Sequence, residues 1–400
     1  MSEKVSLLSG SLLVAGTAIG GGMLALPVLT SPAGFIPSLS VYLVCWLFMS
    51  ATGLLFLEVS QWMKEDSNIV SMADYTLGKF GRYFAWVLYL FLFYCLLIAY
   101  VVGLGNIITE LSLSTIPDWL GPILFVLLFA PLILIPTFLA TKLNVFLVGG
   151  LVLSYFAFII LGFSSINLNL LRDHEWSKSL LVLPIAFTSF AYQGIIPTLV
   201  RHMHGDVRRA GKAILIGSFI PLVAYIIWEG FILGIVPKEG PGGLLEALSN
   251  GDNAVYPLRN FIQNPYVYYI GQSFAFFALV TSFLGVSLGL RDFLADGLKI
   301  SQDLKGKILL AGLIFIFPLV IGVLYPHVFL IALSYAGGFG CALLLGLLPI
   351  LMVWRGRYKM GHSDEVVCLP GGRVVLVLLA IFVLFEITSE VVHVINRMSL

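Results

Sequence analysis

The chain has 400 residues, of which 59% are hydrophobic and only 11% are charged. Soluble domains carry about 25% charged residues, so this composition excludes a soluble globular protein and indicates a polytopic membrane protein. The formal net charge of +1, without any basic run between aromatic residues, gives no indication of nucleic-acid binding. The four cysteines lack the paired spacing of a disulfide framework or a zinc site.

Eleven apolar segments are long enough to cross a membrane as helices, since a span needs about 20 residues. In chain order they are 7–30, 35–58, 82–111, 119–139, 143–163, 180–200, 212–236, 267–298, 307–325, 328–353 and 373–395. The third and eighth segments are longer than a bilayer requires, and we expect them to tilt or to extend beyond it.

Lysine and arginine are unevenly distributed over the loops that join these segments. With a cytoplasmic N-terminus, 17 of the 22 basic residues fall inside, and the other five fall outside: Arg172, Lys178, Lys238, Arg259 and Arg397. Because cytoplasmic loops are enriched in these residues, the bias predicts a cytoplasmic N-terminus. With an odd number of spans, the C-terminus lies on the opposite side.

Two of the predicted helices are interrupted. The first contains "VAGTAIGGGMLALP" (14–27), with four glycines and a proline, although glycine weakens a helix interior by about 1 kcal/mol relative to alanine. The sixth contains "FTSFAYQGIIPTLV" (187–200), with Gly194 and Pro197. Interrupted helices at corresponding positions of two halves indicate a binding site near the bilayer midplane.

The chain divides into two halves of five spans, which are inverted relative to one another because five is odd. The predicted units are 1–177 with helices 1–5, 178–355 with helices 6–10, and 356–400 with a cytoplasmic loop and helix 11. Unwound backbone offers N–H donors to a carboxylate and carbonyl oxygens to a cation, as an amino acid zwitterion requires. Alternatively, Gly20 to Gly22 form a close helix-packing face.

Five stretches resemble a known family: "VAGTAIGGGMLALP", "LLFLEV", "PIAFTSFAYQGIIPTLV", "GSFIPLVAYIIWEG" and "TSFLGVSLGLRDFLAD". They are similar to the bacterial tyrosine-specific and tryptophan-specific permeases, the hydroxy and aromatic amino acid permeases of the amino acid–polyamine–organocation superfamily. The likeness runs from about residue 8 to the last helix, and it is closest to the tyrosine-specific members.

The resemblance implies an all-α, leucine-transporter-type fold with a 5+5 inverted repeat and an eleventh helix. It also implies import of aromatic amino acids, tyrosine first, through the inner membrane by H⁺ or Na⁺ symport, with no other cofactor. Tryptophan or another neutral amino acid is the alternative substrate, and the oligomeric state stays open. A channel would need a polar lining or filter, and an enzyme would need convergent titratable groups at mid-depth. Neither pattern is present in the sequence.

The predicted substrate site lies in the two interruptions and on the third helix. Its residues are Thr17, Ala18, Gly20, Gly21 and Gly22, then Ser189, Phe190, Tyr192 and Gln193, and finally Tyr94 and Tyr100. Phe190 and Tyr192 could flank an aromatic ring by offset stacking.

The coupling ion is left open by the residues themselves. In sodium-coupled relatives of the fold that the resemblance implies, helix 1 carbonyls and helix 8 hydroxyls surround a sodium ion, and Gly16, Ile19, Thr281 and Ser282 fit that use. These hydroxyls could instead bond carbonyls of their own helix. Helix 5 lacks the internal lysine that replaces sodium in some proton-coupled relatives.

Ionisable residues in the spans are candidates for gating and ion pairing. They are Glu58, Glu229, Arg291, Asp292 and Asp296. On helix 11, Glu386, Glu390 and His393 share one face, and we expect interhelical pairing there.

Overall fold

The computed structural model describes residues 6–63, 67–112, 115–135, 137–262, 264–301, 303–362 and 366–398. Within these ranges the chain is almost entirely helical, and its only β-type pairing is an isolated bridge between Gly34 and His174. The helices of the first half are α1 (Leu7–Ala18), α2 (Gly21–Thr30), α3 (Phe35–Gln61), α4 (Ile69–Leu111), α5 (Leu120–Phe129), η1 (Ala130–Leu134) and α6 (Thr137–Gly162).

The second half begins after a connection of short 3₁₀ turns. Its elements are η4 (Trp176–Val182), α7 (Leu183–Ser189), η5 (Gln193–Ile195), α8 (Ile196–His202), α9 (Val207–Ile235), α10 (Leu244–Asn250), η6 (Tyr256–Asn260), α11 (Pro265–Leu298), α12 (Leu304–Leu324), α13 (Phe329–Tyr335), the π-helix η7 (Ala336–Leu347), α14 (Leu348–Arg355), the π-helix η8 (Gly356–Met360) and α15 (Gly372–Met398).

Ten of the eleven predicted spans correspond to helices that can cross a membrane. Nine helical segments among the described residues are long and apolar enough, including the interrupted segment Trp176–His202, and the bent pair α1–α2 is the tenth. The segment predicted at 119–139 is shorter than expected. It covers Leu120–Leu134, about 25 Å at the usual rises, because α6 already begins at Thr137.

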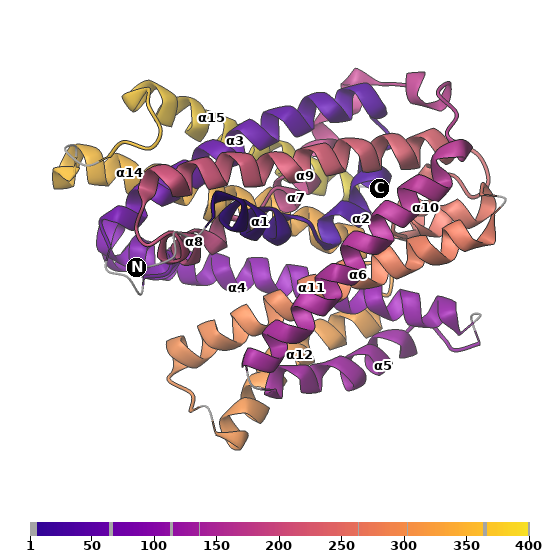
Figure 1. Cartoon of the computed structure of the whole chain (residues 1–400), viewed down its shortest axis with the longest axis horizontal. Coiled ribbons are helices and arrows are strands. Elements are labelled where there is room, and N and C mark those ends of the chain that lie inside the picture. Colours follow the sequence, from indigo (N-terminus) through magenta and orange to yellow (C-terminus); the bar gives the residue numbers. More distant parts are fainter. Residues whose placement is uncertain are drawn as a thin grey trace.

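The two interrupted segments lie in the middle of the bundle (Figure 1). The half-helix α2 packs on α7 and α9, while α1 packs along α9. The long helices α4 and α11 pack against each other, α6 lies on α11, and α15 packs against η7. All ten residues of α2 are buried, so this half-helix is enclosed by protein.

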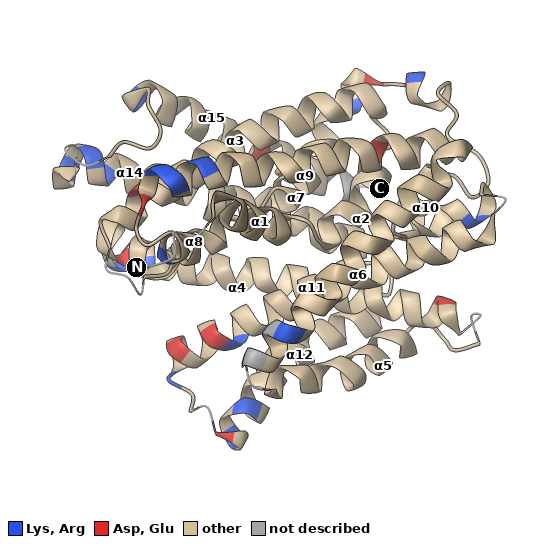
Figure 2. Ribbon diagram, in the orientation of Figure 1, with Lys and Arg blue, Asp and Glu red and all other residues tan. Residues whose placement is uncertain are grey.

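Charged residues gather at the ends of the bundle. Figure 2 shows Lys and Arg concentrated at the end that holds the first helical residues and the start of α9, with fewer at the opposite end. This separation matches the loop asymmetry seen in the sequence. The long middle is apolar, as a protein surrounded by lipid requires.

Candidate functional site: the two broken helices

The first transmembrane segment breaks at Ile19 and Gly20, and the axes of α1 and α2 differ by 55°. The predicted break is thus present but shorter than the sequence suggested. Five positions assigned to it are helical: Gly16, Thr17, Ala18, Gly21 and Gly22.

The helix resumes at once because the first amides of α2 find acceptors. The carbonyl of Gly20 accepts from the Met23 N–H at 3.1 Å. The Ser282 hydroxyl of α11 accepts from the Gly21 N–H at 3.2 Å. A helix N-terminus leaves its first N–H groups without intrahelical partners, so Ser282 acts as a cap supplied by another helix.

The three consecutive glycines are required by close packing as well as by the break. Each faces a different element, and a Cβ atom at any of them would overlap a neighbour. At Gly20 it would meet the Ser282 hydroxyl. At Gly21 it would lie 2.6 Å from Cε1 of Tyr100, and at Gly22 it would lie 2.8 Å from the Ser189 hydroxyl. The two interpretations of these glycines, close helix packing and a helix break, are therefore both correct.

The sixth segment breaks after Ser189, the last residue of α7, and helical turns resume at Gln193. The Tyr192 hydroxyl donates to the Met49 carbonyl at 3.1 Å. The Gln193 amide donates to the same carbonyl and to the Thr52 hydroxyl, both at 3.1 Å. Both side chains are directed at α3 and fix the broken backbone to it, so neither is directed at the break in the first segment.

Tyr225 of α9 joins the two breaks. Its fully buried hydroxyl lies 2.8 Å from the carbonyl oxygen of Ala18 and 2.8 Å from that of Ser189. These two residues end α1 and α7, where carbonyls lack intrahelical donors. One side chain therefore satisfies freed carbonyls from both halves of the chain.

Phe190 lies beside this junction and is 1% exposed. Its ring packs edge-on against Tyr225, with centroids 5.2 Å apart, and against Tyr42 at 6.3 Å. Sequence reasoning found Phe190 but missed Tyr225 and Tyr42. Nothing in the sequence pattern separates these tyrosines from those that face lipid.

Glu229 of α9 is completely buried one helical turn beyond Tyr225. One carboxylate oxygen accepts from the Thr30 hydroxyl of α2, and the other accepts from the Tyr42 hydroxyl of α3 at 2.8 Å. The described contacts of Glu229 are hydrogen bonds, not the ion pair that the sequence suggested. The carboxylate connects α2, α3 and α9.

The two hydroxyls proposed as sodium ligands are hydrogen-bonded to protein in this conformation. Ser282 caps α2, and the Thr281 hydroxyl donates to the carbonyls of Phe277 and Ala278 in its own helix, at 2.8 and 3.1 Å. Ile19 lies in the break, and its N–H donates to the Ala15 carbonyl. Gly16 lies on an exposed part of α1.

The two tyrosines predicted on the third helix have different surroundings. Tyr100 is buried against Gly21, so it belongs to the site. Tyr94 lies on the α12 side, where its hydroxyl donates to the Leu313 carbonyl at 2.8 Å. The structure therefore does not bring Tyr94 to the breaks.

The remaining charged candidates are placed apart from the breaks. Glu58 forms a buried ion pair with Arg357, with N–O distances of 2.5 and 2.6 Å. Arg291 pairs with the adjacent Asp292 at 2.9 Å and also donates to a carbonyl of η1. Asp296 is exposed.

Comparison with known proteins identifies the family of the chain. The tryptophan/tyrosine permease family matches residues 3–389. The chain belongs to this family. This permease is 32% identical over 374 residues to "Tyrosine-specific transport system 1" of Haemophilus influenzae, which covers 93% of each chain. It is 30% identical over 403 residues to a "Tryptophan-specific transport protein" of Pseudomonas aeruginosa, covering 98% of this chain and 95% of the relative.

A solved structure shows the fold of the permease. The crystal structure of MhsT in complex with L-phenylalanine superposes with a TM-score of 0.62, covering 96% of this chain and 98% of MhsT at 15% sequence identity. The leucine-transporter-type fold predicted from the sequence is therefore confirmed. The family consists of transport proteins, so the permease is not an enzyme.

Proposed function

We propose that this permease imports an aromatic amino acid, with tyrosine preferred, across a bacterial inner membrane by symport with a proton. The observation that carries the proposal is the junction of the two broken helices at Tyr225. The tyrosine-specific relative at 32% identity supports the choice of substrate.

The junction offers what a zwitterion needs at both ends. The Ala18 and Ser189 carbonyls, held here by Tyr225, are acceptors for an ammonium group. The N-terminus of α2, held here by Ser282, provides N–H donors and a positive dipole for a carboxylate. Phe190 provides an aromatic wall. A second charge on the substrate would have no partner, and burying it would be costly.

Specificity is tested by uptake of labelled tyrosine into proteoliposomes. Tyrosine and tryptophan should compete far better than leucine, lysine or glutamate. Uptake should saturate, and unlabelled tyrosine inside the vesicles should accelerate entry by counterflow. Equal competition by lysine would refute the aromatic site, and the absence of counterflow would indicate a channel.

The choice of a proton rests on the surroundings of Glu229. Glu229 is a fully buried carboxylate of α9, and it accepts hydrogen bonds from hydroxyls of two other elements, α2 and α3. Intramembrane carboxylates of this kind are functional candidates by default. When Glu229 is ionised, the hydroxyls of Thr30 and Tyr42 both donate to it; when it binds a proton, its single O–H can donate to one of them instead.

Imposing pH and sodium gradients separately tests the coupling ion. Glu229→Gln should keep counterflow but lose accumulation driven by a pH gradient in sodium-free buffer. Thr281→Ala is the matched control and should accumulate substrate as the wild type does. Sodium-dependent uptake that is lost in Thr281→Ala and kept in Glu229→Gln would reverse the assignment.

A further inference from the structure

The eleventh span contains a carboxyl group with unusual surroundings. Glu386 of α15 is 0% exposed, and neither of its side-chain oxygens has a hydrogen-bond partner among the residues that the structure describes. It lies nine residues before Ile395, so it is about 14 Å from the end of the span at the usual helical rise. The interhelical pairing expected there from the sequence is not found for Glu386.

An isolated carboxylate in this position would be very unfavourable. Removing an unpaired charge from water costs far more than one hydrogen bond, and a group so placed becomes neutral by binding a proton. A neutral carboxyl still has an unsatisfied hydroxyl and carbonyl, which is unfavourable in a buried position. A residue retained for packing alone would be better served by an apolar side chain of similar size.

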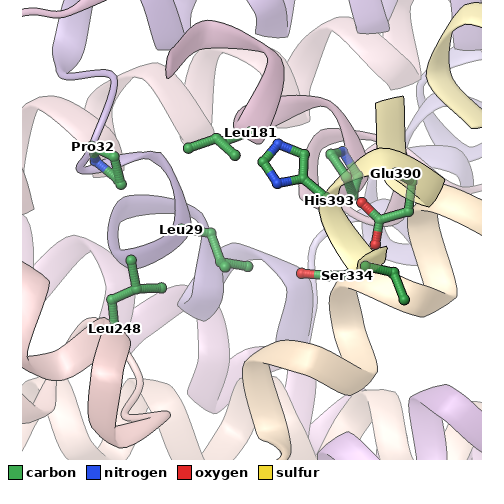
Figure 3. Close-up of a pocket in the computed structure, with 9 residues that line it drawn as sticks. Leu29, Pro32, Leu181, Leu248, Ser334, Glu390 and His393 are labelled. Atoms are coloured by element: carbon green, nitrogen blue, oxygen red, sulfur yellow. The ribbon is translucent and has the colours of Figure 1, made fainter. Parts of the chain in front are cut away.

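A route to the aqueous phase begins one turn away. Glu390 and His393 follow Glu386 at helical spacings of four and three residues, so they lie on the same side of α15. Both line a cavity of about 60 Å³ with Ser334 of α13 and apolar residues of α2, η4 and α10. Figure 3 shows Glu390 and His393 projecting from α15 toward this cavity, with the Ser334 hydroxyl facing it. The volume is sufficient for water.

Glu386, Glu390 and His393 form a stripe along one side of α15, and packing links this stripe to the broken sixth segment. The Glu390 side chain lies over Gly338 of η7, where a Cβ atom would be 2.7 Å from its Cγ. The preceding Gly337 lies against the Pro184 carbonyl and Thr188 of α7. The seam between α15 and η7 is therefore one layer from the break at Ser189.

We propose that Glu386, Glu390 and His393 form a proton-exchange site, through which a proton from the outer solution reaches a carboxylate oxygen of Glu386 by way of the cavity. Only O–H and N–H bonds form and break along this path. The outer side is the one opposite the loops rich in Lys and Arg, as the charge distribution predicts. A role of this site in coupling rests on the transport function proposed above.

The other ionisable groups near the stripe are few. Cys45 of α3 lies near Glu386, and Lys178 of η4 lines a surface pocket together with His393. On the other elements packed against α15, Cys341 of η7 faces Cys95 of α4, Arg355 of α14 is exposed, and α7 has no titratable side chain. Within this described set, no cation lies beside Glu386 to hold it ionised.

Infrared difference spectroscopy tests the protonation directly, without transport. The wild-type protein in vesicles should show a C=O stretch of a protonated carboxyl group that is absent in Glu386→Gln and present in the control Glu239→Gln, whose carboxylate is exposed. On transfer to D₂O the band should shift, and Glu390→Gln should slow that shift. A spectrum in which Glu386→Gln removes no such band refutes the proposal, as does exchange at the wild-type rate in Glu390→Gln combined with His393→Leu.

The coupling role has a separate readout. If protonation of one group limits uptake, the rate changes by up to about tenfold per unit of outer pH, and Glu386→Gln should flatten this dependence while keeping counterflow of tyrosine. Tyrosine uptake with a pH profile unchanged in Glu386→Gln would overturn the coupling role alone. If the wild type takes up no aromatic amino acid, the proposed function is overturned, but the infrared result still stands.

Discussion

Replacing Tyr225 by phenylalanine removes one hydroxyl from the junction of the two broken helices. The ring stays, and so does its edge-on contact with Phe190. What is lost is the donor that lies 2.8 Å from the carbonyl oxygens of both Ala18 and Ser189. Both carbonyls are at the C-terminal ends of helices, so no backbone amide of their own helix takes over.

The size of the effect follows from burial. Leaving a buried acceptor without a donor costs about 1–3 kcal/mol, which corresponds to a change of about 5- to 150-fold in the equilibrium that depends on it. The two carbonyls share one proton, so the cost of one acceptor is the appropriate estimate. The variant should unfold at a lower denaturant concentration. Its apparent affinity for tyrosine should rise, because the substrate ammonium no longer has to displace the Tyr225 hydroxyl from the two carbonyls.

Tyr155→Phe is the matched control. The hydroxyl of Tyr155, in α6, donates to the carbonyl of Ala224 in α9 at 3.1 Å. Because Ala224 lies inside α9, its carbonyl keeps an intrahelical bond when the hydroxyl is removed. Chemical unfolding in detergent and tyrosine uptake should both be measured for the two variants. If Tyr225→Phe has no larger effect than Tyr155→Phe in either assay, the bridging role assigned to Tyr225 is wrong.

Other residues allow equally direct tests. Arg357→Leu leaves the Glu58 carboxylate buried without its cation, so we expect a loss of about 3–5 kcal/mol in chemical unfolding, largely recovered when Glu58→Gln is added. Gly22→Ala should reduce uptake at matched expression because its methyl group would overlap the sixth-segment break, whereas Gly149→Ala, with open space around it, should not. Burial and then the charge of Glu58 raise the pKa of the Cys368 thiol to about 12. Since the thiolate is the reactive form, maleimide labelling followed by mass spectrometry should be slow at pH 8 and accelerate as the pH rises.

The overall fold was predictable because its causes are local. Long apolar segments must become helices in lipid, and the glycines and prolines of 14–27 and 187–200 are where those helices are weakest. The extent of the first break was not predictable. Gly21 remains helical because Ser282, 261 residues away, accepts its N–H, and a distant cap of this kind leaves no mark near the glycine.

The side chains of the site were harder to predict for a similar reason. Glu229 was found because a buried charge is rare, but its partners Thr30 and Tyr42 are ordinary residues 199 and 187 positions away. Tyr94 and Tyr100 are six residues apart, so they differ by about 240° around the helix axis. Periodicity shows that they face different ways, and only packing decides that Tyr100 faces Gly21.

The two halves of the first segment differ in how firmly they are held. Every residue of α2 is buried, and its end is fixed to α3 and α9 by Thr30, Glu229 and Tyr42. In α1, by contrast, only five of twelve residues are buried, and Gly16 and Thr17 are exposed next to the break. A segment with fewer buried contacts opens at lower free energy. We therefore expect α1 to swing about Ile19 and Gly20 while α2 stays in place, with Tyr225 as the contact that must be released first.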